Sequence, residues 1–397
     1  MKRYALPFAL CCLLVASCKK ETKDKNLPIV YDNGPTDSLK LNQIQIIASH
    51  NSYHLKTDSS IFAWMSKADS LGILPSSYSP TGIDYTHLPI EQQMSDYNVR
   101  GLEIDFYNDP LGGQFYNRQG FSLIAQGSKI ESHIEELKQP GFKVVHIPDF
   151  DFNTNYYTFK QALTAVYNWS VSHPNHLPVF INIETKEETV GGTLPTVPGL
   201  TVAVPFDADA CNKMDEEIKS IFGDALNKVI TPDNVRGTYS TLEAAALAGN
   251  WPTLAQARNK VVFIMQGAAE DLYTVGHPSL QGRAMFVYSN PGTPEAAFVI
   301  MNNSAQVTQI QNRVQQGYIV RTRADDGTTQ ARVGDYSDMN NAFMSGAQII
   351  STDYYKADAR AGTTGWTDYH VQFPNGELAR IDSFSAPDKM NLGLIKE

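Results

Sequence analysis

Cysteine is scarce in this chain, and its placement excludes a disulfide-held fold. Four cysteines occur in 397 residues, and Cys11, Cys12 and Cys18 all lie near the amino terminus. Cys211 is the one cysteine of the remaining chain, and a single thiol cannot form an intramolecular disulfide. No histidine-bearing motif accompanies Cys211, so we expect a small packed residue there and not a nucleophile.

Basic clusters are also missing, which excludes one class of partner. The chain has 32 Lys and Arg against 42 Asp and Glu, for a formal net charge of −10, and Lys and Arg dominate no segment. Because nucleic-acid binding requires a basic footprint, we expect no nucleic-acid partner. The mild acidity favours solubility. We see no internal repeat, and the 42% apolar content is enough for a sizeable core.

The apolar run behind the basic start MKR is too short for a comfortable membrane span and is typical of a signal peptide. It ends in Val15, Ala16, Ser17 and Cys18, and small residues before a cysteine resemble the lipobox of bacterial lipoproteins. We therefore expect residues 1–17 to be a lipoprotein signal peptide and Cys18 to be lipidated. The alternative is an ordinary secretory signal cut near Ser17.

The segment 18–40 is polar and charged, and we expect it to form a tether to the membrane. The protein is then exported and lipid-anchored to the bacterial envelope, at the outer membrane on its periplasmic face or at the cell surface. We expect one catalytic domain over 41–397, in a monomer.

Short apolar runs alternate with longer mixed segments through this domain. Runs of four to six apolar residues are typical of parallel strands that are buried on both faces, and apolar residues spaced by three and four indicate helices. Strands are predicted over 44–49, 101–106, 143–146, 179–183, 261–265, 297–301, 318–322 and 347–351, and helices over 130–138, 157–173 and 209–222, with a further helix opening at Pro89.

Eight strand–helix alternations predict an α/β fold, a TIM-type (β/α)₈ barrel with its active site at the carboxyl ends of the strands. The segment 285–288 competes for the sixth strand. The insertion 189–205 follows the fourth strand directly. A solvated loop is the simpler interpretation, and a role at the substrate mouth or at lipid is the alternative.

Polar side chains collect where the first four predicted strands end. Glu103 and Asp105 are two residues apart, so they share a face of their strand. Two carboxylates aimed together into a barrel are costly unless a cation lies between them. Hard oxygen ligands suit Ca²⁺ or Mg²⁺ better than zinc, and two imidazoles can serve as general base and general acid. The strand ends supply His50, Asn51, Glu103, Asp105, His146, Glu184 and Lys186.

A lone histidine at a strand end is most often structural, so the joint pattern carries the functional interpretation. The segments ASHNSYH, GLEIDFY, VVHIPD and INIETK, followed by GYIVRTRADD and GAQIISTDY, resemble the calcium-dependent phosphoinositide phospholipase C family of bacteria. The resemblance covers residues 41–355. The related glycerophosphodiester phosphodiesterases open with a His-Arg pair, whereas Asn51 follows His50 here.

The resemblance implies a role for each matching residue. His50 and His146 are the expected catalytic pair, and Ca²⁺, with Mg²⁺ less favoured, is expected on Asn51, Glu103, Asp105 and Glu184. Lys186, Arg321, Arg323 and Tyr354 are the expected substrate contacts. An ion pair with Asp325 or Asp326 is the alternative for the two arginines, and a structural tyrosine is equally compatible with Tyr354. His54 gains no partner and is interpreted as a loop histidine.

The implied reaction releases diacylglycerol from phosphatidylinositol by cleaving the glycerol–phosphate bond, through a 1,2-cyclic inositol phosphate. Eukaryotic enzymes bind polyphosphorylated head groups with many basic residues, and this sequence has no clear counterpart of them. We therefore expect unphosphorylated phosphatidylinositol as the substrate. One alternative is a phosphodiesterase for glycerophosphodiesters, sphingomyelin-like lipids or glycosyl-phosphatidylinositol. A second is a non-catalytic surface lipoprotein that binds inositol or glycan.

Overall fold

The computed structural model describes Met1 and residues 34–397, except 76–77 and 195–196. The chain divides into two units, Met1–Val30 and Tyr31–Glu397, and the architecture below is that of the second. The expected signal peptide, Cys18 and most of the expected tether lie outside the described residues. Over the described part of the chain, no helix combines the length and the apolarity that a bilayer span requires.

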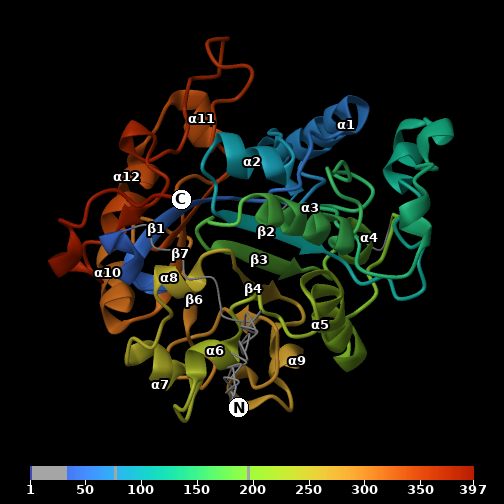
Figure 1. Cartoon of the computed structure of the whole chain (residues 1–397). Helices are drawn as coiled ribbons and strands as arrows, with labels where there is room; N and C mark the ends of the chain where they lie inside the picture. Colours follow the sequence, from blue (N-terminus) through green and yellow to red (C-terminus); the bar gives the residue numbers. More distant parts are fainter. Residues whose placement is uncertain (2–33, 76–77, 195–196) are drawn as a thin grey trace. The chain divides into compact units, whose positions relative to one another are not determined.

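Eight parallel strands form a nearly closed barrel, which confirms the predicted TIM-type fold (Figure 1). They run in the order β5-β4-β3-β2-β1-β8-β7-β6. The two end strands approach each other through a parallel bridge between Tyr288 and Phe298. The strands are β1 (Ile44–Ser49), β2 (Gly101–Phe106), β3 (Val179–Thr185), β4 (Val261–Gly267), β5 (Phe286–Val287), β6 (Phe298–Ile300), β7 (Ile319–Arg323) and β8 (Ile349–Thr352), and the short β9 (Arg380–Ile381) pairs antiparallel with β1.

Helices follow the strands and cover the barrel (Figure 1). They are α1 (Ser59–Ser70), α2 (Ile90–Asp96), α3 (Phe159–Ser172), α4 (Val190–Thr193), α5 (Ala208–Phe222), α6 (Pro232–Arg236), α7 (Leu242–Leu247), α8 (Leu254–Ala257), α9 (Glu270–Thr274), α10 (Val307–Gln316), α11 (Thr329–Val333) and α12 (Ser337–Ser345).

Local sequence explains where the two longest of these helices begin. Thr158 and Gln161 form a capping box at the start of α3, and the Asp207 side chain accepts from the Ala210 backbone N–H at the start of α5. Both helices match the predictions within two residues. The helix predicted over 130–138 is wrong, since only a 3₁₀ turn at Glu135–Lys138 forms there.

The strand predicted over 143–146 is also wrong. Strands β2 and β3 pair directly, with Leu102 opposite Ile181, and leave no place between them. The segment instead forms a loop over the end of β2, where Lys143 exchanges two backbone hydrogen bonds with Tyr107. The barrel still has eight strands, because the segment 285–288, which had competed for the sixth predicted strand, forms the additional strand β5. His146 therefore reaches the site from a loop.

Gly101 lets β1 and β2 approach at the point where their ladder begins. Its only strand partner on β1 is Ala48. A Cβ at position 101 would lie 2.4 Å from the Ala48 Cβ, a distance that no side chain tolerates. This contact fixes β1 against β2, so the polar residues that follow Ala48 are held beside those of β2.

The folded body includes residues that the sequence analysis placed in the tether. Pro35–Ser38 forms a 3₁₀ turn, and Leu39 is fully buried. The Asp37 carboxylate lies 2.7 Å from the Arg258 guanidinium in a buried ion pair. Cys211 is a free thiol in the core, and burial raises its pKa, as expected for a packed residue.

Candidate active site

Strand register places the acidic side chains next to one another at the carboxyl end of the barrel. Asp105 on β2 lies opposite Glu184 on β3, and Glu184 lies opposite Gln266 on β4. Glu103 lies one layer deeper, opposite Asn182. The predicted alternation along β2 therefore holds, since residues two apart point to the same side of the strand.

The structure brings Glu103, Asp105 and Glu184 together as predicted. One carboxylate oxygen from each residue lies within 4.8 Å of the corresponding oxygens of the other two. Burial and the adjacent Glu184 carboxylate raise the pKa of Asp105 well above its ordinary value. Such crowding of negative charge is favourable only beside a cation. All-oxygen donors of this kind fit a hard divalent ion such as Ca²⁺.

Lys186 places its ammonium among the same carboxylates. Its Nζ lies 3.3 Å from Asp105 Oδ2 and 3.8 Å from Glu184 Oε1. These two carboxylates raise the pKa of Lys186 in spite of its burial. Lys186 is therefore a fixed positive charge at the carboxylate cluster.

Glu103 is tied to the barrel interior by a buried ion pair. Arg321 Nη2 donates to Glu103 Oε2 at 2.7 Å, and the guanidinium also donates to Asn302 and Ser351. Asn182 and Gln266 donate to the other carboxylate oxygen at 2.7 and 3.1 Å. Arg321, predicted to contact the phosphate or the inositol ring, is 2% exposed and pairs with Glu103 in this structure.

His50 is held at the end of β1 by a carboxylate and an arginine. Its Nδ1 donates to Asp353 Oδ1 at 2.7 Å, and Arg323 Nη2 donates to the other oxygen of Asp353 at 3.0 Å. Burial and the Arg323 guanidinium lower the pKa of His50 well below its ordinary value. Because Nδ1 donates to Asp353, Nε2 is the accepting nitrogen: Arg323 Nη1 donates to it at a long 3.4 Å, and Glu103 Oε2 lies 3.9 Å from it.

His146 is held in the same way by a different carboxylate. Its Nδ1 donates to Asp151 Oδ2 at 2.8 Å. A tight turn aligns the pair: Ile147 and Asp151 exchange backbone hydrogen bonds, and Asp149 has a left-handed φ of 71°. Burial and the nearby Lys186 ammonium lower the pKa of His146. Both predicted catalytic histidines therefore present Nε2 and fix Nδ1 through a carboxylate.

Exposure separates the groups that reach solvent from those that support them. The side chains of His50, His146 and Lys186 are 19%, 16% and 18% exposed. Arg323 is 14% exposed and Glu184 31%. In contrast, Glu103, Asp105, Asp151 and Asp353 are 0–3% exposed. Bases, acids and cations thus line an accessible mouth above a layer of buried carboxylates.

Two other predicted residues lie beside this arrangement. Asn51, at a positive φ of 45°, donates its amide to the Tyr85 hydroxyl at 2.9 Å. Tyr354 is 2% exposed and packs edge-on against Tyr369. The structure therefore keeps Tyr354 among core aromatic residues.

The carboxylates that orient the two histidines were not predicted from the sequence. Asp353 directly follows β8, where an acidic residue after IIST was a usable signal. Asp151 lies five residues after His146 in VVHIPDFD, a spacing that only the turn makes meaningful. Asn182 on β3 and Gln266 on β4 point into the barrel and donate hydrogen bonds to Glu103 and Glu184. These two amides were not predicted as site residues either.

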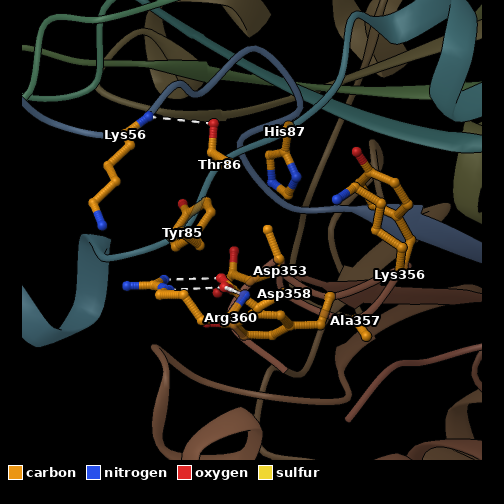
Figure 2. Close-up of a pocket in the computed structure, with 12 residues that line it drawn as sticks. Lys56, Tyr85, Thr86, His87, Asp353, Lys356, Ala357, Asp358 and Arg360 are labelled. Atoms are coloured by element: carbon orange, nitrogen blue, oxygen red, sulfur yellow. Dashed lines mark hydrogen bonds and ion pairs between the residues drawn. The ribbon is translucent and has the colours of Figure 1, made fainter. Parts of the chain in front are cut away.

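A cavity of about 180 Å³ adjoins the site (Figure 2). Tyr85 and Asp353 line it, so its wall contains the partners of Asn51 and His50. Two of its cations form ion pairs with Asp84, since Lys56 lies 3.1 Å and Arg360 2.8 Å from that carboxylate. Substitutions in this wall are therefore expected to act through Tyr85 and Asp353.

A nearly closed parallel barrel with three clustered carboxylates and two carboxylate-held imidazoles at its carboxyl end is the arrangement of a TIM-barrel enzyme suited to phosphodiester chemistry. Residues 39–383 match the family model described as phosphoinositide phospholipase C, Ca²⁺-dependent. The chain therefore belongs to the calcium-dependent phosphoinositide phospholipase C family, a family of phosphodiesterases. A comparison with curated proteins gives no significant match.

Solved structures provide a second comparison. The myo-inositol complex of a calcium-dependent phosphoinositol-specific phospholipase C from a Gram-negative Pseudomonas sp. is 16% identical, with a TM-score of 0.50 over 87% of this chain and 96% of that one. The Ca²⁺-dependent phosphatidylinositol-specific phospholipase C from Streptomyces antibioticus is 15% identical, with a TM-score of 0.48 over 80% of this chain and 95% of that one. The phosphatidylinositol-specific phospholipase C from Listeria monocytogenes is 10% identical, with a TM-score of 0.44 over 80% of this chain and 90% of that one. The Pseudomonas structure supports the fold assignment.

Proposed function

We propose that this protein is a calcium-dependent phospholipase C that cleaves the glycerol–phosphate bond of phosphatidylinositol. The observation that supports this proposal is the pair of carboxylate-held, partly exposed imidazoles of His50 and His146 beside a cluster of three carboxylates. General acid–base chemistry on a phosphodiester needs two proton-transferring groups and positive charge at the phosphate.

The residues that would hold calcium are Glu103, Asp105 and Glu184, with the amide oxygen of Asn51 as the fourth expected ligand. A bound calcium ion would offset the negative charge that develops on the phosphate oxygens during the reaction. Lys186 and Arg323 supply positive charge at the same mouth. The Asp353 carboxylate holds Arg323 in place, whereas the Lys186 ammonium, 3.3 Å from Asp105, would move aside when calcium binds.

The two histidines perform the proton transfers in the proposed reaction. The inositol 2-hydroxyl oxygen forms a bond to phosphorus while the bond from phosphorus to the glycerol oxygen breaks. One ring is neutral and accepts the proton of the attacking hydroxyl at Nε2, while the other is an imidazolium that donates its Nε2 proton to the glycerol oxygen as diacylglycerol leaves. Asp353 and Asp151 accept from Nδ1–H of the two rings and thereby orient Nε2 of both toward the substrate. The products are diacylglycerol and inositol 1,2-cyclic phosphate.

Product analysis tests this function. Purified protein is incubated with phosphatidylinositol vesicles in calcium or in excess chelator, and the phosphorus products are followed by ³¹P NMR. We expect the resonance of a cyclic inositol phosphate in calcium and none in chelator. Turnover of glycerophosphodiesters in Mg²⁺, without any cleavage of phosphatidylinositol in calcium, would reject the proposal.

We propose in addition that the protein is exported and anchored by a lipid on Cys18, which would place the catalytic body at a bacterial membrane. The support is the sequence Val15 to Cys18 behind the short apolar run. A Cys18→Ala variant should leave the membrane fraction and appear in the soluble fraction. A variant that remains with the membrane would contradict lipidation at this position.

A further inference from the structure

His54 has a buried partner that the sequence analysis did not anticipate. Its side chain is completely buried, and its Nε2 lies 2.7 Å from Asp151 Oδ2. The same oxygen accepts from His146 Nδ1 at 2.8 Å, and the Thr57 hydroxyl donates to the other oxygen at 2.5 Å. Asp151 thus receives three hydrogen bonds from side chains, two of them from histidines.

The arrangement defines which atoms of His54 bear protons. Nε2 must donate, because an ionised carboxylate only accepts. The other nitrogen, Nδ1, is buried and has no hydrogen-bond partner among the described residues. A second N–H there would be a buried donor without an acceptor, which is unfavourable. The hydrogen bond to Asp151 therefore places a proton on His54 Nε2.

We propose that His54 is a positioning residue for His146 and acts through the carboxylate that the two histidines share. The Nε2–H of His54 and the hydroxyl of Thr57 fix both oxygens of Asp151. The carboxylate then presents Oδ2 to His146 in one orientation, which holds the ring with Nε2 toward the mouth. This inference rests on the proposed function insofar as it assigns proton transfer to His146.

The surroundings of His146 show why this support matters. Lys186 opposes a positive charge on His146, whereas Asp151 favours one. Electrostatic attraction to His54, together with the hydrogen bonds from His146 and His54, holds the pKa of Asp151 below its ordinary value in spite of burial. The His54 N–H competes with His146 for the charge on Oδ2, so its loss strengthens the attraction between Asp151 and a protonated His146. Removal of the His54 donor should therefore raise the pKa of His146 and loosen the orientation of its ring.

His54 also links the acid–base pair to the expected metal ligand Asn51. Its ring packs against the Tyr85 ring, with centroids 4.5 Å apart, and Tyr85 accepts from Asn51. The His54 and His146 rings meet edge to face at 5.8 Å. This packing leaves little freedom for the His54 ring to rotate, as a positioning role requires.

The test compares variants that keep or remove the donor to Asp151. His54→Gln retains an amide N–H that can reach the position of Nε2. His54→Leu removes the donor, and His54→Asn replaces it with an amide that is too short to reach Oδ2. His176→Leu is the control for loss of a buried histidine, since the His176 side chain forms its hydrogen bonds with Ser170 and Leu177 and packs against Trp169.

Two readouts are used: the pH dependence of kcat on phosphatidylinositol, and the NMR titration of the His146 imidazole without substrate. In His54→Leu we expect kcat to fall about tenfold or more, with little change in KM, and the His146 titration to move to higher pH. His54→Gln should restore both, and His176→Leu should change neither. His54→Asn should behave like His54→Leu and replaces it if the leucine variant does not fold.

The outcomes separate this inference from the proposed function. A folded His54→Leu or His54→Asn variant with the wild-type His146 titration and the wild-type kcat profile would overturn the positioning role. Absence of any phosphatidylinositol cleavage by the wild-type protein would reject the proposed function. The NMR titration would still decide whether His54 acts on His146.

Discussion

Replacement of Lys186 by glutamine should tighten calcium binding, although Lys186 lies within the site. Its Nζ is 3.3 Å from Asp105 and 3.8 Å from Glu184, inside the carboxylate cluster that we propose as the calcium site. The ammonium compensates the same negative charge that a calcium ion would compensate. Calcium must therefore displace this ammonium or bind against its repulsion. A glutamine at position 186 has no charge and removes this repulsion.

Coulomb's law sets the upper size of the effect. At these separations, and with an effective dielectric constant of about 20, each ammonium–carboxylate contact is worth roughly 4 kcal/mol. The Lys186 side chain is 18% exposed, so water screens part of this energy and the ammonium can turn toward solvent. If screening leaves about a third of the energy of one contact, removal of the ammonium strengthens calcium binding by about 1.4 kcal/mol, which is a tenfold decrease in Kd.

Isothermal titration of CaCl₂ into the protein measures this change without substrate. Lys213→Gln is the matched control, because Lys213 forms an exposed pair with Asp209 on α5 at 2.6 Å. We expect the calcium Kd to decrease in Lys186→Gln and to remain unchanged in the control. A Lys186→Gln variant that binds calcium no more tightly than the wild type would refute competition for the same carboxylates.

Three further predictions address catalysis and stability. His50→Ala and His146→Ala should each lower kcat on phosphatidylinositol by about 10²-fold or more; a loss below about threefold would remove that histidine from the mechanism. Glu103→Gln should lower the free energy of unfolding in urea by about 3–5 kcal/mol in chelator, because it leaves the buried Arg321 charge unpaired; an unchanged urea midpoint would show that the pair contributes nothing. Burial raises the pKa of Glu217 from 4.5 to about 7, so folding favours its protonated form and this contribution to stability is lost as pH rises from about 4.5 to 7. Glu217→Gln should therefore be more stable than the wild type at pH 8, by at most about 3 kcal/mol, and should lose this advantage near pH 4; equal thermal midpoints at pH 8 would contradict a buried carboxylate at this position.

The barrel was predictable because its strands are apolar runs that end in polar residues. The segment 143–146 misled the prediction for a physical reason: VVHI has the composition of a buried strand, but pairing depends on whether neighbouring strands leave a gap. Here β2 and β3 pair directly. Strand β5 has two residues, which is too short for periodicity to distinguish it from a loop.

The candidate site was predictable where it depends on alternation along one strand. Glu103 and Asp105 share a face, and so do Arg321 and Arg323, and both pairs point into the barrel. At β8 the sequence analysis selected Tyr354 because aromatic rings stack on sugars, but its neighbour Asp353 points to His50.

Long-range pairing lies beyond such reasoning. The carboxylate of Asp353 meets His50 across 303 positions of the chain, and Arg321 meets Glu103 across 218. The shared carboxylate of Asp151 depends on a turn that places His54 and His146 on one oxygen. Neither alternation nor spacing indicates such contacts, because both are set by tertiary packing.

The central claim is that calcium binds among the carboxylates beside the two imidazoles, and anomalous diffraction from crystals soaked in CaCl₂ tests it most directly. We expect a calcium peak within about 2.3–2.6 Å of oxygen atoms from Glu103, Asp105 and Glu184, with the Lys186 ammonium displaced from them. A calcium-saturated crystal with no peak at these carboxylates would contradict the claim.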